Sequence, residues 1–216
     1  MFPLNTVLFP GISVPLHVFE DRYRALVHAL LRVEDPDRRL FGSVAIREGY
    51  EVGERGGQSL HRIGCLLQLV QAEAHPDGTF DIVARGCGRL RLDGLDTSGP
   101  WLAGEVEVLE DEDPRTAPEL LDRARATFDR YREVLAEVHG EDVLAGELPE
   151  EPTALSFTLA ATAVLTLRQR QDLLEALGAA DRLIQVTRFL HEEIRTMTAM
   201  PSLPAAELAR TGWCPN

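Results

Sequence analysis

Alternating apolar and polar positions indicate β-structure in the first half of the chain. From Phe80 to Leu92 every second residue is apolar or glycine, and the residues between them are mostly polar. Side chains of a strand point to alternate faces, so this pattern predicts one long strand with a core face. His-Pro-Asp-Gly at 75–78 is a strong turn signal and predicts a hairpin with a second strand at 60–74.

Shorter strands are predicted on both sides of this hairpin. Alternation at 40–46 predicts one strand, and alternation at 101–109 predicts another, with Leu102, Val106 and Val108 on the face opposite Glu105 and Glu107. The polar, glycine-containing stretch 48–59 is predicted to be a loop.

The N-terminal stretch carries two strand-like apolar pieces, Val7–Phe9 and Ile12–Leu16. Pro10 and Gly11 between them predict a sharp turn, because proline fixes φ and glycine permits positive φ. Pro15 has no N–H, so its strand should lie at a sheet edge or end there.

A helix is expected to open at Phe19. Phe19, Tyr23, Leu26 and Leu30 recur at helical spacing, so they should form its buried face.

The pattern changes after the acidic stretch 110–114. Apolar residues from Leu121 to Val138 then recur at steps of three and four, which predicts an amphipathic helix. Further helices are predicted at 154–167 and 168–177, the second ending at Gly178. Asp181 is expected to cap a last helix with Leu183, Val186, Leu190, Ile194 and Met197 on its buried side.

These elements predict an α+β fold with a β-rich lobe over residues 1–110, a helical lobe over 111–200 and a tail at 201–216. An acidic loop is expected at 140–152, between the first two helices of the helical lobe.

Composition narrows the function classes. The net charge of −13 over 216 residues argues against nucleic-acid binding, which usually needs a basic face. No apolar run approaches the roughly 18 residues of a membrane span, and the N-terminus does not resemble a signal peptide. The three widely spaced cysteines favour a reducing, cytoplasmic location over a disulfide framework.

The sequence contains no lysine, and all 22 of its cationic residues are arginine. A Walker phosphate loop, a Ser–Lys dyad and a Schiff-base enzyme each need a lysine. These three kinds of catalytic site are therefore excluded.

Other catalytic and metal motifs are incomplete. Gly57–His61 ends in histidine where a nucleophile elbow around Ser59 needs glycine, and His191–Arg195 has arginine in place of the second zinc ligand. Cys65 and Cys87 lack C-x-x-C partners, so buried structural cysteines are favoured over a zinc site with His61. The acidic cluster Asp111–Asp113 is interpreted as a solvated linker. We therefore predict no catalytic residue, no cofactor and no metal.

A family resemblance emerges from several motifs in order. P-L-x-x-V-x-F-P-G-x-x-x-P-L-x-V-F-E-x-R-Y at 3–23 resembles the opening of the Lon peptidase N-terminal domain. Further similar stretches are G-S-V-A-I at 42–46, I-G-C-L-L-Q at 63–68, P-D-G-T at 76–79, V-A-R-G-C-G-R-L-R-L at 83–92, L-S-F-T-L-A-A at 155–161, R-Q-R-Q-D-L-L-E-A at 168–176 and D-R-L at 181–183. The similarity covers roughly residues 1 to 198.

The resemblance implies a PUA-like β pseudo-barrel lobe followed by an α-helical bundle lobe. In Lon proteases this domain recognises substrates and precedes the ATPase and peptidase domains. The chain ends about where the ATPase domain would begin, so the resemblance implies a free-standing bacterial form that binds unfolded or tagged polypeptides without cleaving them. An adaptor role in protein quality control, beside a protease or chaperone, is one version of this reading.

The surface that would bind such a polypeptide is predicted at the broken N-terminal strand. Its apolar part would include Phe9, Pro10, Ile12, Pro15 and Tyr23, although all of these are also expected core residues. Arg85, Arg89 and Arg91 share a strand face, and either form an ion-paired outer surface or a polar rim beside the peptide.

Two other functions remain as alternatives. One is a small hydrolase with an unrecognised site. The other is RNA binding, which rests on the PUA-like fold alone and conflicts with the acidic charge.

Overall fold

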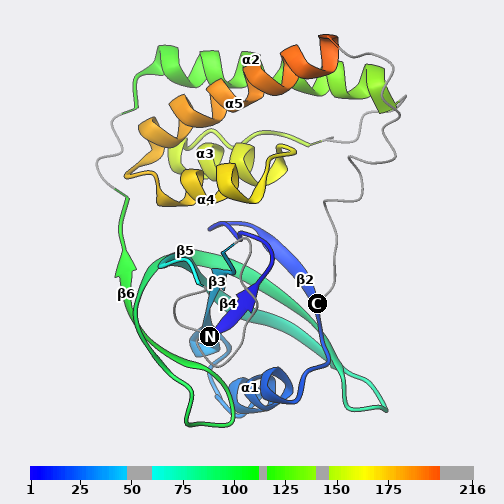
Figure 1. Cartoon of the computed structure of the whole chain (residues 1–216), viewed down its shortest axis with the longest axis vertical. Helices are drawn as coiled ribbons and strands as arrows, with labels where there is room; N and C mark the ends of the chain where they lie inside the picture. The colour runs from blue at the N-terminus through cyan, green and yellow to red at the C-terminus, as the bar shows by residue number, and fades with distance from the viewer. Residues whose placement is uncertain (48–59, 112–115, 140–145, 200–216) are drawn as a thin grey trace. The chain divides into compact units, whose positions relative to one another are not determined.

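The structure is a computed structural model, and it describes residues 1–47, 60–111, 116–139 and 146–199. The predicted loop at 48–59, with Ser59, lies outside these residues, as do the predicted tail at 201–216 and part of the loop at 140–152. The chain divides into two compact units, Met1–Glu110 and Asp111–Cys214. Each unit is described by itself (Figure 1).

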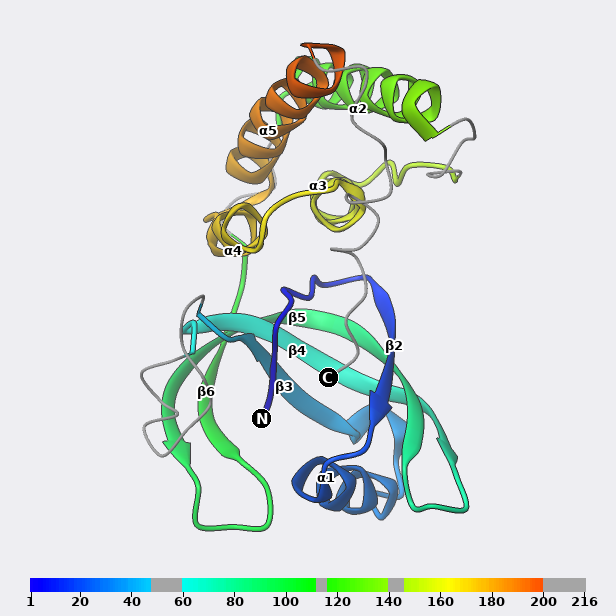
Figure 2. The same ribbon diagram turned by 45° about the vertical axis from the view of Figure 1, so that its right-hand side comes forward.

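The described part of the first unit contains a mixed sheet and one α-helix, as expected for an α+β fold. Its elements are β1 Phe2–Leu4, β2 Ser13–Val18, α1 Asp21–Leu31, the 3-10 turn η1 Pro36–Arg38, β3 Leu40–Ala45, β4 Ile63–Ala74, β5 Phe80–Asp96 and β6 Ala103–Leu109. The strand order is β1-β3-β4-β5-β2, with β6 also paired to β5. The pair β1–β3 is parallel and the other pairs are antiparallel. Figure 2 shows β4 and β5 as long curved strands.

The long hairpin β4–β5 confirms the prediction from alternation. Phe80, Ile82, Ala84, Leu90 and Leu92 are all buried. At the turn, the His75 N–H donates to the Thr79 carbonyl and the Gly78 N–H donates to the His75 carbonyl. Gly78 has a φ of 84°, which glycine adopts without strain.

The N-terminal stretch differs from its prediction in one respect. The first strand is β1, and Val7–Phe9 is buried but is not a strand. The predicted turn at Pro10 and Gly11 is present, and Gly11 has a φ of 81°. The apolar run at 7–9 is therefore a core segment, because burial alone does not specify strand pairing.

Gly86 allows this turn to lie directly against β5. The Gly11 N–H donates to the Gly86 carbonyl, and the Gly86 N–H donates to the Ile12 carbonyl, both at 2.9 Å. A Cβ atom at position 86 would lie 2.2 Å from the Phe9 carbonyl oxygen. Any side chain larger than hydrogen would force these two backbone segments apart.

Helix α1 begins two residues later than predicted. Phe19 precedes the helix and 44% of its side chain is exposed, so its prediction as a buried helical residue was wrong. Tyr23, Leu26 and Leu30 are buried as expected, together with Val27. They pack into a core cluster with sheet residues that include Phe2, Phe41, Leu67, Leu69, Phe80 and Ile82.

β6 lies within the strand predicted at 101–109. Its apolar residues Val106 and Val108 are both exposed, Val108 by 58%. β6 pairs with β5 only, among the described strands, so it lies at an edge where alternation does not require burial.

The second unit is helical. Its elements are α2 Pro118–His139, α3 Pro152–Thr162, α4 Leu167–Glu175 and α5 Ala179–Ala199. Ala124, Phe128, Tyr131 and Leu135 of α2 are buried, as their spacing predicted. The Tyr131 hydroxyl accepts a hydrogen bond from the Val164 N–H at 3.0 Å, which connects α2 to the segment after α3.

Two predicted helix ends were wrong. α4 ends at Glu175 with Ala176 as its C-cap, two residues before Gly178. Asp181 lies inside the first turn of α5. The carbonyl of Gly178, just before the helix, accepts from the Arg182 N–H. The Gly-Ala-Ala stretch thus starts α5 directly, and Asp181 complements the positive end of the helix dipole rather than capping it.

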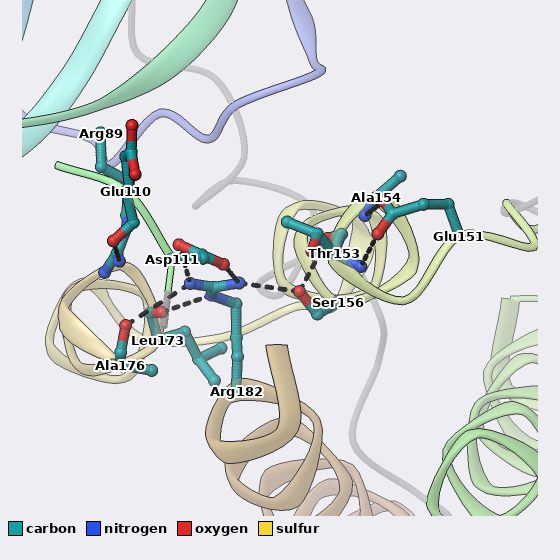
Figure 3. A network of polar contacts seen from close by, with 10 residues as sticks. All are labelled: Arg89, Glu110, Asp111, Glu151, Thr153, Ala154, Ser156, Leu173, Ala176 and Arg182. Carbon is teal, nitrogen blue, oxygen red and sulfur yellow. Dashed lines mark hydrogen bonds and ion pairs between the residues drawn. The ribbon is translucent and has the colours of Figure 1, made fainter. Parts of the chain in front are cut away.

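A buried arginine links the helices of this unit (Figure 3). Arg182 of α5 has no exposed surface, and its guanidinium makes a two-nitrogen contact with the Asp111 carboxylate at 3.0 and 3.3 Å. It also donates to Ser156 Oγ and to the carbonyls of Leu173 and Ala176. The interpretation of Asp111 as part of a solvated linker was therefore wrong.

Candidate functional site

The strands β2, β5 and β4 present one face away from the core, which we call the outer face. Directly opposite residues of paired strands share a face. The register therefore defines three rows across the strands: Ser13–Arg85–Gln68, Pro15–Val83–Gln71 and His17–Asp81–Glu73. The side chains of β2 on this face are exposed, whereas Val14 and Leu16 between them pack on the core cluster.

The middle row of the outer face carries two apolar residues, Pro15 and Val83, beside Gln71. Pro15 is exposed and Val83 is half-buried. A register shift between Leu69 and Gln71 leaves Val70 as an extra residue of β4 beside this row, with 56% of its side chain exposed. An apolar strip of Pro15, Val83 and Val70 therefore faces solvent.

The free edge of the sheet borders this strip. β2 pairs only with β5 among the described strands, so its other side is an edge. Because the Ile12 carbonyl accepts from Gly86, and ladder bonds alternate with period two, the backbone groups of Ser13, Pro15 and His17 point outward. Pro15 lies in an edge strand, as predicted, and its missing N–H falls on the outward side, where it interrupts pairing with another strand.

The first row of the outer face carries its positive charge. Arg85 is exposed opposite Ser13 on one side and Gln68 on the other. Leu40 of β3 lies opposite Gln68 and is also exposed. This row therefore combines the cation of Arg85 with the exposed apolar side chain of Leu40.

The third row contains a cluster of His17, Asp81 and His75. His17 Nδ1 lies 2.7 Å from one oxygen of Asp81, and His75 Nε2 lies 2.8 Å from the other. The hydrogen bonds from both histidines lower the pKa of the Asp81 carboxyl, and the bond to Asp81 raises the pKa of His75. One carboxylate thus holds two imidazoles on the surface.

The residues predicted to bind a peptide fall into two groups. Phe9 and Tyr23 are core residues with 1% and 5% exposure, and Tyr23 stacks on Phe2 at 4.2 Å. Arg89 is also buried, and it donates to the Glu110 carbonyl. These three side chains are not available on the surface.

The remaining predicted residues lie close together. Pro10 and Ile12 are half-buried next to Gly86, while Pro15 and Arg85 are exposed on the outer face. Arg91, on the same strand face, pairs with Asp93 and Glu107. Sequence reasoning missed Val70, because alternation puts it on the same face as Gln68 but does not tell whether an apolar side chain there is covered or exposed.

The cysteines do not form a metal or nucleophilic site in the described part of the chain. Cys65 is buried, and burial raises the pKa of its thiol to about 12. Cys87 is exposed, and partial burial raises the pKa of its thiol. Both are therefore thiols rather than reactive thiolates near neutral pH. His61 is half-buried and its backbone N–H donates to the Ala45 carbonyl.

A curved mixed sheet with an apolar strip on its outer face, followed in the chain by a helical unit, defines an α+β protein. Residues 1–192 match the model of the ATP-dependent protease La (LON) substrate-binding domain. The chain belongs to this family.

Relatives and solved structures agree with this family. The chain is 29% identical to Lon protease 1 of Syntrophobacter fumaroxidans and 27% identical to the Lon protease of Elusimicrobium minutum, over 91% and 90% of its length. It spans only 24% and 23% of those relatives. The crystal structure of a Lon N-terminal domain protein from Xanthomonas campestris matches 87% of this chain and 95% of its own, with 25% identity and a TM-score of 0.63. The N-terminal domain of a Mycobacterium avium complex Lon protease, 21% identical, matches 88% of this chain and 96% of its own with a TM-score of 0.57 and has the same fold.

Among the described residues, no helix combines the length and the apolar composition that crossing a bilayer requires.

Proposed function

We propose that this chain binds extended polypeptide segments with apolar side chains on the outer face, and that it does not cleave them. The observation that carries the proposal is the solvent-facing strip of Pro15, Val83 and Val70 beside the edge of β2. Membership of a substrate-binding domain family supports a polypeptide as the ligand.

The outer face suits an extended chain better than a folded one. Neighbouring strands are about 4.8 Å apart, so the strip crosses three strands over about 10 Å. An extended segment that pairs with the edge of β2 runs parallel to the strands, so it would place an apolar side chain at the end of the strip, beside Pro15. Arg85 lies at the rim, where it would attract acidic residues that flank the apolar ones.

The edge of β2 supplies backbone hydrogen bonds to such a segment. Ser13 and His17 offer outward N–H and carbonyl groups, whereas Pro15 offers only its carbonyl. A peptide that adds to β2 as a strand gains a short ladder with one missing bond. Affinity should therefore be modest, on the order of micromolar, and it should persist in high salt because apolar burial dominates.

Fluorescence anisotropy with labelled peptides tests this proposal on the full chain. An apolar peptide should bind more tightly than a polar peptide of equal charge. Val70→Asp should weaken binding by about ten-fold because it places a charge in the strip. Val108→Asp is the matched control, since it introduces the same charge at an exposed strand valine of β6 and should leave affinity unchanged.

A second variant tests the edge itself. Pro15→Val restores an outward N–H and should tighten peptide binding or promote pairing of two copies through β2. Equal binding of apolar and polar peptides, or equal weakening by Val70→Asp and Val108→Asp, would contradict the outer face as the site. Retention of the chain on immobilised RNA, lost with salt, would favour nucleic-acid binding instead.

The non-catalytic part of the proposal rests on the lysine-free sequence. Without lysine the chain cannot build the Walker phosphate loop or a Ser–Lys dyad. Purified chain should leave casein intact in the presence of ATP and should not hydrolyse generic esters. An adaptor role, in which a bound polypeptide passes to a protease or chaperone, is the finer form of the proposal, and crosslinking in the native cell would identify that partner.

A further inference from the structure

The His17–His75–Asp81 cluster has the donor set of a metal centre. Each residue offers one ligand atom, and no two of these atoms are more than 4.8 Å apart. Among the described residues, this is the one group of three or more histidine, cysteine, aspartate or glutamate side chains whose ligand atoms lie this close together. Its members come from β2, from the β4–β5 turn and from β5, so the fold assembles it from distant parts of the sequence.

The backbone holds all three side chains in place. His17 and Asp81 are directly opposite residues of β2 and β5, at a position without ladder bonds between them, where side chains approach most closely. His75 lies at the base of a turn closed by its own N–H and carbonyl. Asp77 stiffens this turn by accepting from the Thr79 N–H and hydroxyl.

We propose that His17, His75 and Asp81 bind a divalent transition-metal ion, with Zn²⁺ as the best match to the donors. Imidazole nitrogen and carboxylate oxygen are the donors that Zn²⁺ takes alongside thiolate, and three protein ligands leave a fourth position for water or another ligand. Mg²⁺ and Ca²⁺ prefer sites made only of oxygen.

The change in geometry needed to bind Zn²⁺ is small. Bonds of 2.0–2.2 Å in a tetrahedral site place ligand atoms about 3.3 Å apart. The contacts of Asp81 with His17 and His75, at 2.7 and 2.8 Å, must lengthen by about half an ångström. The two imidazole nitrogens must also move to within bonding distance of the ion. His17 and Asp81 are exposed and His75 is half-buried, so these shifts do not disturb the core.

Coordination replaces the two histidine–aspartate hydrogen bonds. Each imidazole presents to the ion the nitrogen that now faces Asp81, and the proton on that nitrogen moves to the other ring nitrogen or to solvent. Asp81 binds as a carboxylate. The exposed ring of Phe19 stacks near His17, with centroids 6.1 Å apart, and limits rotation of that imidazole.

A metal at this position would join the edge strand β2 to the tip of the β4–β5 hairpin. It would lie one row away from the apolar strip, on the same outer face. The inference does not depend on the proposed function, since it rests on the three side chains and their distances alone.

Isothermal titration of the full chain with Zn²⁺ tests the site. One ion should bind, and His75→Gln and Asp81→Asn should each weaken its affinity by more than about 100-fold, since even loss of an indirect contact costs 10- to 100-fold. His191→Gln is the matched control, because it removes an exposed histidine of α5 and should leave the affinity unchanged. Zn²⁺ should also raise the Tm of the wild type and of His191→Gln but not of His75→Gln.

Cysteine ligation is excluded by separate variants. Cys87→Ser and Cys214→Ser should both bind Zn²⁺ as the wild type does, and the Co²⁺ form should show visible bands of a tetrahedral site without a thiolate charge-transfer band. Circular dichroism of each variant confirms that it is folded. The proposal is overturned if the wild type fails to bind Zn²⁺ below about 1 mM, if His75→Gln and Asp81→Asn bind like the wild type, or if a cysteine variant abolishes binding.

Discussion

Two arginines show how differently the two units use the same side chain. Arg182 in the helical unit is fully buried, and carboxylate, hydroxyl and carbonyl oxygens surround its guanidinium. Arg85 in the sheet unit projects from the exposed outer face. In the helical unit the charge holds secondary-structure elements together, whereas in the sheet unit it remains available to a ligand. The charge of a residue therefore says little about its role until its burial is known.

The units also differ in what stabilises their connections. Side-chain polar contacts join the helices, with Arg182 contacting residues before α2 and in or after α3 and α4. In the sheet unit, backbone segments pack directly against each other, as Gly86 of β5 does against the Phe9 carbonyl. Substitutions should therefore act through lost partners in one unit and through steric overlap in the other.

The largest expected effect is on the buried ion pair. Asp111→Ala should lower the free energy of unfolding of the helical unit by about 3–5 kcal/mol, because it leaves the Arg182 guanidinium buried without its carboxylate. Urea denaturation followed by circular dichroism measures the loss. Asp122→Ala, at an exposed position of α2, is the control and should change stability by less than about 0.5 kcal/mol. Equal effects of the two variants would show that the pair is not a structural link.

A smaller effect is expected at the backbone contact of the sheet unit. Gly86→Ala should destabilise this unit by about 1–3 kcal/mol, because the new Cβ would overlap a backbone carbonyl that cannot rotate away. Gly88→Ala, two residues along β5, is the matched control, since its Cβ would meet no atom within 4 Å. Denaturation followed by tryptophan fluorescence compares them, and similar midpoints would mean that the turn at Pro10 and Gly11 adjusts without cost.

The smallest effect is expected at the start of α3. The Glu151 side chain accepts from the Thr153 and Ala154 N–H groups at 2.8 and 2.6 Å. Glu151→Ala should therefore cost about 1 kcal/mol, the usual contribution of an N-cap. Glu150→Ala is the exposed neighbour that should have little effect.

The same cap should respond to acid. Burial pushes the pKa of the Glu151 carboxyl up, but the hydrogen bonds from Thr153 and Ala154 outweigh it and the net pKa is lowered. Since the folded-state pKa lies below the ordinary value of 4.5, the contribution of this cap to stability is complete above pH 4.5 and is lost as the pH falls through the folded-state pKa. The difference in stability between wild type and Glu151→Ala should shrink on acidification, and a constant difference would contradict this role.

Much of the fold followed from local patterns. The hairpin at 60–92 and the buried side of α2 were predictable because alternation and helical periodicity report directly on one buried face. The α+β class followed from their order. Helix ends were less predictable, since Gly178 and Asp181 each carry a signal that fits two neighbouring positions.

The candidate site was less accessible to sequence reasoning. The sequence does not show whether the apolar side chain of Val70 is covered, and His17, His75 and Asp81 meet only through the register of three chain segments. Phe9 and Tyr23 were expected core residues that were also considered for the binding surface, because an apolar residue in a motif has the same appearance whether it packs inside or binds a ligand. Asp111 was misinterpreted because its partner, Arg182, lies 71 residues away in the sequence.

Strand β5 has a consequence for the order in which the sheet forms. Its first half pairs with β2 and its second half with β6, along the same side. β4 and β6 are neighbours of β5 in the sequence and close short loops, whereas His17 and Asp81 are 64 residues apart. Loop-closure entropy favours the local pairs first. β2 should therefore join last during folding and detach first during local opening, so the strand beside the apolar strip is also the part of the sheet that the chain can release without losing the rest.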